Sequence, residues 1–199
     1  NKDGNVLLIQ GTYRRFFLSM QVGQLPFYNN TQIKMTKKLI SNLSKSIFQN
    51  TILRFHNQYG FGEIEKIKKD FKDIKISTRE EESHFYRLLF NSKLLVVFID
   101  FTTFKQSFVI NHPTILIWDK NYFTNRKSAK KYFDVLHEAG ILYYSEEECA
   151  KKINEIYKNP YEWWNSNKVQ KAKNYFMNYF CNYNDNVVND LSKLIKSIA

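Results

Sequence analysis

The segment from Phe98 to Trp118 constrains the fold more than any other part of the sequence. An apolar run ends on Asp100, and Thr102 and Thr103 open a short helical pattern. An Asn-His-Pro corner then leads into a second apolar run, Thr114–Trp118. Near-continuous apolar strands joined by a helix are typical of a parallel sheet covered on both faces. The segment therefore predicts a strand–helix–strand unit of an α/β fold.

The same alternation continues along most of the chain. Further strands are predicted at Val6–Gln10, Thr51–Phe55, Ile74–Ser77, Leu94–Ile99 and Ile141–Tyr144. Helices are predicted at Gln32–Phe48, Glu63–Phe71, Ser83–Asn91, Thr103–Ile110 and Ser128–Glu138. Strands that alternate with helices at this spacing form right-handed βαβ units. We therefore predict a Rossmann-like, three-layer α/β/α fold with a mostly parallel sheet of about six strands.

The last third of the sequence carries only helical patterns. Ser145 and Glu148 form a capping box that opens one helix. A second is predicted from Asn159-Pro160 to Phe180, and a third, with its apolar residues on one face, over Asn186–Ile198. We expect residues 1–158 to form the Rossmann-like domain and residues 159–199 to be C-terminal helices that pack on it as part of the same unit.

Composition narrows the classes of partner. A chain of 199 residues with 43% hydrophobic and 17% aromatic residues suits one folded domain and is unlike a disordered chain. The net charge of +11 indicates anionic partners such as nucleotide phosphates, nucleic acid or an acidic membrane surface. The lysines are spread through most predicted helices, which favours a solvated surface and argues against a nucleic-acid site.

The sequence lacks the motifs of several common binding and catalytic sites. It contains no P-loop, no G-x-G-x-x-G fingerprint, no D-x-D motif, no G-x-S-x-G elbow and no metal-ligand spacing. Its two cysteines do not form a disulfide framework and are expected to be free thiols. No apolar run reaches eighteen residues, and no signal-peptide pattern occurs. Because the chain begins at Asn1 without Met, we expect that an upstream portion is missing.

The loops after the strands are the expected place for chemistry. Open α/β sheets bind ligands beyond the carboxyl ends of their strands, where helix N-termini receive anions. Arginine side chains hold phosphate oxygens bidentately, so arginines and a hydroxyl-led helix start together suit a diphosphate. The candidate binding residues are Arg14, Arg15, Arg54, His56, Asp100, Thr102, Thr103 and Gln106.

Each candidate also has a structural interpretation. The turn that holds Arg14 and Arg15 can be an ordinary one with solvated side chains, and His56 can bind a backbone carbonyl. Thr102 and Thr103 can serve only as a helix N-cap. His112, before Pro113, is interpreted as part of a tight corner, and Trp163 and Trp164 as packing residues.

Two short motifs resemble those of GT-B glycosyltransferases. Arg54-Phe55-His56, at the end of a strand, resembles the basic-x-His element of these enzymes and of their polysialyl- and glycerolphosphate-transferase relatives. Thr102-Thr103-x-x-Gln106 resembles their Ser/Thr-Ser/Thr-x-x-x-Glu helix start, with Gln106 in the acidic position when the count begins at Thr102.

Longer stretches resemble one bacterial family of surface-carbohydrate transferases, the LIC12162 type. Its pattern of an Asn-x-Pro-Thr-Ile strand start, a Ser-Ala-Lys-x-Tyr-Phe-Asp helix and a Glu-Trp-Trp helix is similar to residues 111–115, 128–134 and 162–164. The resemblance covers most of the chain, best from Phe98 to Phe180, and corresponds to the carboxyl-terminal half of the family's proteins.

This resemblance implies a metal-independent glycosyltransferase domain, without a cofactor, that binds a nucleotide-sugar donor. It implies that Arg54 and His56 contact the donor phosphates, supported by Arg14 and Arg15, and that Thr102 and Thr103 bind the second phosphate or a ribose. It implies that Gln106 forms a hydrogen bond to a hydroxyl of the donor. At this position a neutral amide replaces the carboxylate that is usual in the related enzymes.

The implied role is in cell-surface polysaccharide synthesis, such as lipopolysaccharide or capsule. An N-terminal lobe of the full-length protein would bind the glycan acceptor and supply the catalytic base, so none is assigned here. The implied location is cytoplasmic, with peripheral contact to the anionic inner face of the membrane as an option. Two rival functions stay open: a non-catalytic α/β binding or assembly module, favoured by Gln106, and, with less support, a nucleic-acid-binding domain.

Overall fold

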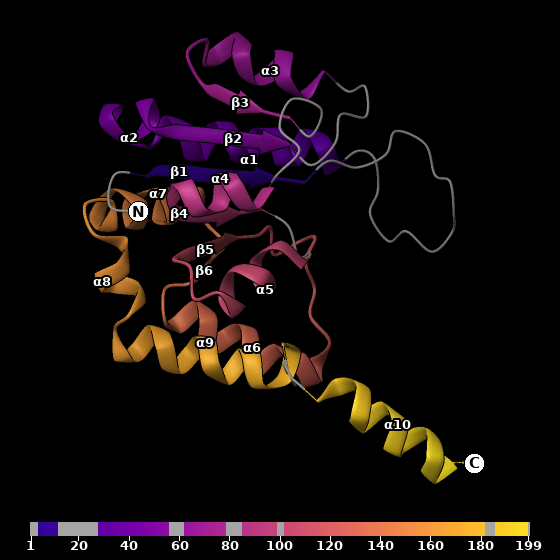
Figure 1. Ribbon diagram of the computed structural model, residues 1–199. Coiled ribbons are helices and arrows are strands. Elements are labelled where there is room, and N and C mark those ends of the chain that lie inside the picture. The colour runs from indigo at the N-terminus through magenta and orange to yellow at the C-terminus, as the bar shows by residue number, and fades with distance from the viewer. Residues whose placement is uncertain are drawn as a thin grey trace.

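The computed structural model describes residues 4–11, 28–55, 62–78, 85–98, 102–181 and 186–198. A six-stranded, all-parallel sheet runs through its centre in the order β3-β2-β1-β4-β5-β6 (Figure 1). The strands are β1 Asn5–Gln10, β2 Thr51–Phe55, β3 Lys75–Ser77, β4 Ser92–Val97, β5 Thr114–Ile117 and β6 Leu142–Tyr143. This is the strand order of doubly wound nucleotide-binding folds, so the predicted Rossmann-like fold is confirmed.

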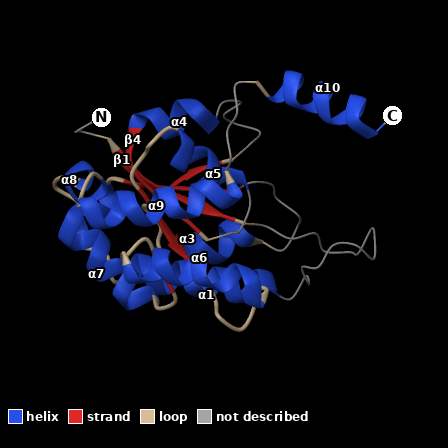
Figure 2. Cartoon of the chain, turned by 90° about the horizontal axis from the view of Figure 1, so that it is seen from below, coloured by secondary structure: helices blue, strands red, loops and turns tan. Residues whose placement is uncertain are grey.

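Helices cover both faces of the sheet, as Figure 2 shows from a second direction. They are α1 Tyr28–Ser41, α2 Lys45–Gln49, α3 Glu63–Asp70, α4 Phe85–Asn91, α5 Thr102–Val109, α6 Lys127–Glu138, α7 Glu146–Ile156, α8 Pro160–Trp164, α9 Asn167–Phe180 and α10 Val187–Ile198. None of these helices is both long and apolar enough to cross a bilayer.

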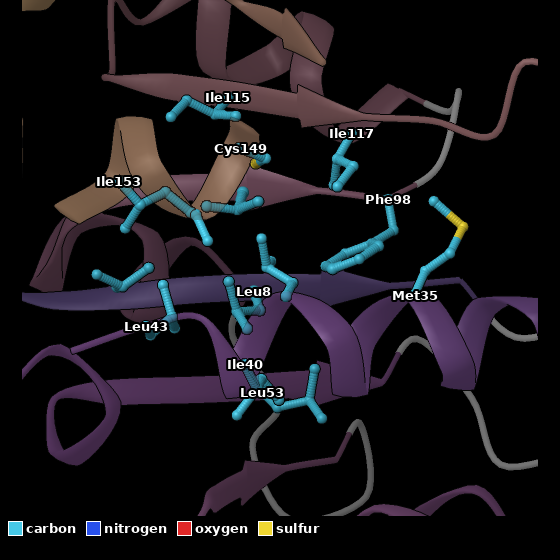
Figure 3. Packing of buried hydrophobic residues seen from close by; sticks show 14 of the residues in the cluster. Leu8, Met35, Ile40, Leu43, Leu53, Phe98, Ile115, Ile117, Cys149 and Ile153 are labelled. Carbon is cyan, nitrogen blue, oxygen red and sulfur yellow. The ribbon is translucent and has the colours of Figure 1, made fainter. Parts of the chain in front are cut away.

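The alternation of side chains along β1 divides the core into two layers. Val6 and Leu8 pack with buried residues of α1, α3 and α7, whereas Leu7 and Ile9 pack with those of α5, α6 and α9. Figure 3 shows the first layer, in which Leu8 lies among side chains of α1 and α7. Every residue from Val6 to Gln10 is buried, as expected for a central strand that is covered on both faces. This burial explains the apolar run in the sequence.

The long helix predicted over Gln32–Phe48 is in fact two helices. The side chains of Ser41 and Asn42 both donate to the carbonyl of Lys38, at 2.9 and 2.7 Å, which ends α1. Asn154 of α7 fixes the segment between α1 and α2. Its side-chain amide donates to the carbonyl of Asn42, and its side-chain oxygen accepts from the backbone N–H of Ser44. A residue more than 100 positions away therefore fixes this corner.

The helix predicted from Asn159-Pro160 to Phe180 is likewise divided, into α8 and α9. The two are separated at Asn165 and Ser166, where the side-chain amide of Gln170 donates to the carbonyl of Trp164 at 2.7 Å. Trp164 is fully buried, which confirms its interpretation as a packing residue. α9 supplies buried Val169, Ala172 and Phe176 to the second layer, whereas α10 supplies no buried residue.

Candidate functional site

The register of the sheet aligns the carboxyl ends of its first four strands. Ile9 of β1 lies beside Arg54 of β2 on one side and Val97 of β4 on the other, and Arg54 lies beside Ser77 of β3. The strand order reverses between β1 and β4, and this switch point is where such sheets bind ligands. The candidate site is therefore the carboxyl edge around β1, with β2 and β4 on either side.

Arg54 provides a positive charge at this edge. Its side chain is buried, and its Nη1 donates to Ser77 Oγ at 2.8 Å and to the carbonyl of Thr78 at 3.4 Å. These bonds draw the guanidinium across the ends of β2 and β3. An arginine keeps its charge when buried, so the edge carries a fixed cation. The sequence indicated Arg54 but gave no sign of its partners Ser77 and Thr78.

The first turn of α5 lies on the other side of β1, just beyond β4. Thr102 is exposed and Thr103 is half-buried, and the first turn contains no acidic residue. Phe104 and Phe108 are fully buried and fix the helix against the second layer of the core. The leading amides of a helix have no partner within it and carry a partial positive charge. This helix start can therefore receive an anionic group.

A buried polar cluster lies between β1 and α1 and was not foreseen from the sequence. The hydroxyl of Thr36 lies 3.0 Å from Gln10 Oε1, and Gln32 Nε2 donates to the carbonyl of Phe98 at 3.1 Å. Gln10 and Gln32 are completely buried, and Gln10 Nε2 has no hydrogen-bond partner among the described residues. Buried polar atoms in native proteins usually have partners, so this cluster is suited to a polar ligand at the end of β1.

Two tyrosines border the cluster on the side of β5. Tyr28, the first residue of α1, stacks on Tyr122 with ring centroids 3.5 Å apart. Burial raises the pKa of both phenols above the ordinary value of a tyrosine. Both side chains are therefore neutral at physiological pH and keep the proton that a phenol donates in a hydrogen bond.

The structure locates four of the eight predicted binding residues. Arg54, Thr102 and Thr103 lie on the carboxyl edge, with Arg54 on the β2 side of β1 and the two threonines beyond β4. Gln106 is exposed one turn further along α5, where it lines a groove with largely apolar walls. The other four, Arg14, Arg15, His56 and Asp100, lie outside the described residues. In the described part of the chain, no group of three or more His, Cys, Asp or Glu residues is placed to hold a metal ion.

Comparison with known proteins decides the family. A profile described as LIC12162 family transferase matches residues 1–195. The chain belongs to the LIC12162 family of transferases. No curated protein matches it.

One solved structure is distantly similar to this chain. A UDP-N-acetylglucosamine 2-epimerase from Listeria monocytogenes, solved at 2.2 Å, is 12% identical, with a TM-score of 0.43. The match covers 88% of this chain and 39% of that one, so the chain spans less than half the length of the solved protein.

The motifs shared with the LIC12162 family mostly build the scaffold. Asn111 lies before β5, at the amino edge of the sheet and opposite the candidate site, and has a left-handed backbone with φ of 55°. Its Oδ1 accepts from Trp164 Nε1 at 3.0 Å, from Gln170 Nε2 at 3.2 Å and from Lys173 Nζ at 2.6 Å. The Asn-His-Pro corner and the Glu-Trp-Trp helix are thus two parts of one structural contact.

His112, in the same corner, is also structural. Its ring is buried, and burial lowers the pKa of His112 to about 4. Ser92 donates its hydroxyl to the carbonyl of Leu89 at 2.7 Å, so it accepts from His112 Nε2 at 3.2 Å. A neutral imidazole in this position ties the start of β4 to the corner before β5.

Proposed function

We propose that this chain is the donor-binding domain of a GT-B-like glycosyltransferase that uses a nucleotide sugar. Membership of a transferase family supports transfer chemistry. The observation that carries the donor assignment is the switch point between β1 and β4, with Arg54 on one side and the start of α5 on the other. The Arg54 guanidinium bonds to Ser77 at the end of β3 and α5 begins beyond the end of β4, so a nucleoside diphosphate held by both would lie across the end of β1.

The chemistry of the transfer explains why such an edge is needed. As the glycosyl bond to the donor phosphate breaks, the departing nucleoside diphosphate gains negative charge. A fixed guanidinium and helix amides that already point at this charge stabilise the transition state without reorganising. In this proposal Arg54 and His56 bind phosphate oxygens with support from Arg14 and Arg15, and the start of α5 binds the second phosphate or a ribose.

The remaining roles belong to the same proposal. Asp100 and Gln106 would bind sugar or ribose hydroxyls, and the donor would be held without a metal ion. A separate N-terminal lobe of the full-length protein would hold the glycan acceptor and the catalytic base. We place the reaction in bacterial surface-polysaccharide synthesis, in the cytoplasm, with a product such as lipopolysaccharide or capsule.

Calorimetric titration with UDP, GDP and CMP tests the proposal. We expect at least one nucleotide to bind, and Arg54→Ala and His56→Ala to weaken that binding by about tenfold or more, because each removes a charge-assisted phosphate contact. Lys171→Ala, which removes an exposed charge from α9, is the matched control and should bind normally. The absence of binding by all three nucleotides at millimolar concentration refutes the proposal.

A non-catalytic binding module is the second candidate, and one observation favours it. Gln106, which stands where the related enzymes carry a carboxylate, lines an apolar groove together with Tyr86, Val109 and Ile110. This function predicts a partner whose affinity survives Arg54→Ala and His56→Ala unchanged.

A further inference from the structure

Two buried polar groups near the carboxyl edge have no assigned role in the proposed function. Glu63, the first residue of α3, is 3% exposed, and Gln10, the last residue of β1, is completely buried. Among the described residues, neither Glu63 Oε1 nor Gln10 Nε2 has a hydrogen-bond partner. A buried polar atom without a partner costs free energy. Two such atoms at a ligand-binding edge indicate that a ligand supplies the partners.

Both groups lie on the face of the sheet that α1 and α3 cover. Ile9 packs in the layer of α5, so Gln10, the next residue, points to the opposite face. There its Oε1 lies 3.0 Å from the hydroxyl of Thr36 in α1. Glu63 lies one turn before Ile67, which is buried in the layer of α1, so both residues face the sheet from the same side of α3.

The first turns of α1 and α3 are also in contact. Lys66 Nζ, in the first turn of α3, donates to Asn30 Oδ1, in the first turn of α1, at 3.2 Å. The strands that precede these helices are neighbours, and Gln10 at the end of β1 lies beside Phe55 at the end of β2. Glu63 and Gln10 therefore belong to one region of the carboxyl edge.

Arg54 points to the opposite face of the sheet. Leu53 and Phe55 both pack in the layer of α1, so Arg54, between them, is directed toward the layer of α5. The start of α5 lies on that face too, because Phe104 packs in the second layer of the core. The groups that we propose for the phosphates thus lie on one face, and the carboxyl and amide without partners lie on the other.

We propose that Glu63 and Gln10 bind the hydroxyl-bearing part of the donor, its ribose or its sugar, an inference that rests on the proposed function. The phosphates would lie on the α5 face and the hydroxyls on the α1 face, across the end of β1. A carboxyl oxygen accepts from a hydroxyl, and an amide nitrogen donates to one, so the pair suits a group that offers both. A fully ionised phosphate has no proton to donate to Glu63, so the pair does not fit a phosphate.

Calorimetric titration of Glu63→Met and Gln10→Met with UDP, UDP-glucose and inorganic pyrophosphate tests the proposal. Pyrophosphate should bind both variants as it binds wild type, because Arg54 and the start of α5 are unchanged. If the pair binds the ribose, UDP should bind both variants about tenfold or more weakly; if it binds the sugar, only UDP-glucose should be weakened to that extent. If GDP or CMP binds wild type better than UDP, it and a sugar nucleotide built on it replace the uridine pair. Glu65→Met removes an exposed carboxyl from the same turn of α3 and is the matched control.

The melting temperature without ligand separates a binding role from a structural one. Methionine is similar in size to Glu and Gln and has no polar atom that needs a partner. Glu63→Met should therefore melt a few degrees above wild type. Gln10→Met should melt no lower than wild type, because the Thr36 hydroxyl keeps its bond to the carbonyl of Gln32 at 2.9 Å.

Three results would overturn the inference. The first is binding of nucleotide and sugar nucleotide that Arg54→Ala weakens and both methionine variants leave unchanged, which would spare the proposed function. The second is a variant that weakens pyrophosphate as much as the nucleotide, or that melts well below wild type, since the residue would then support the fold. The third, no binding of any nucleotide by wild type, would refute the proposed function as well.

Discussion

Acid should destabilise this protein through His112, and the size of the effect can be worked out from the structure. The ring is buried with a folded pKa of about 4, against about 6.5 for a histidine in an unfolded chain. The unfolded state therefore binds a proton that the folded state does not, between these two pH values. The stability that depends on neutral His112 is complete above about pH 6.5 and is lost as the pH falls to about 4.

The full shift corresponds to about 3 kcal/mol of unfolding free energy, and most of it is lost by about pH 4.5. For a chain of this size, that loss lowers the melting temperature by about 5–10 °C. Carboxylates also titrate in this range, so wild type alone does not isolate the histidine. His112→Gln keeps an amide that can donate to Ser92 and has no charge at any pH, which makes it the matched control.

Urea unfolding of both proteins at several pH values between about 7.5 and 4.5 measures the effect. We expect the stability difference between wild type and His112→Gln to change by about 2–3 kcal/mol across this range, with wild type losing more in acid. A difference that stays constant with pH would refute the reasoning, because it would mean that His112 titrates alike in the folded and unfolded chain.

Substitutions at three positions test the scaffold by the same urea assay. Asn111→Ala should cost about 2–4 kcal/mol, because it removes the oxygen that holds the Lys173 ammonium and replaces Asn, which tolerates a left-handed φ, with a residue that does not. Asn111→Gly removes the same side-chain oxygen but adopts a left-handed φ without strain, so it should cost about 1 kcal/mol less than Asn111→Ala. Equal costs would refute the backbone part of this account. Gly4→Ala should cost about 3 kcal/mol or more, since its β-carbon would lie 2.5 Å from the carbonyl oxygen of Asn91; a loss below about 1 kcal/mol would contradict the tight contact. Ser145→Ala should cost about 1 kcal/mol, because it removes the hydroxyl that caps α7. An unchanged stability would show that the hydrogen bond from the Glu148 N–H to this hydroxyl does not stabilise the fold.

The strands were predictable because burial on both faces leaves long apolar runs, and all six appear within two residues of their expected positions. The helix breaks were not predictable, because they depend on distant partners. Nothing near Asn42 in the sequence indicates that Asn154 will close the corner after α1. The pattern of α10 predicted a helix with one apolar face, but a pattern carries no information on what covers that face.

The candidate site was predictable to a similar degree. A basic residue at a strand end and hydroxyls at a helix start indicate a phosphate site, because the fold brings such ends to one edge. That reasoning located Arg54 and Thr102 correctly on the carboxyl edge. It missed Gln10 and Gln32, because a polar residue that ends an apolar strand, or lies within a helix, looks like an ordinary boundary or surface position. Their burial emerges only when α1 packs on the sheet.

The most direct test of the central claim is to locate a bound nucleotide by NMR. Titration of the ¹⁵N-labelled chain with UDP, or with whichever nucleotide binds best, reports on each backbone amide. We predict the largest shift changes at Thr102 and Thr103, at the start of α5, and at Ser77 and Thr78 beside Arg54. Changes confined to the far side of the molecule, or absent from both of these segments at saturation, would contradict a donor site at the carboxyl edge of this sheet.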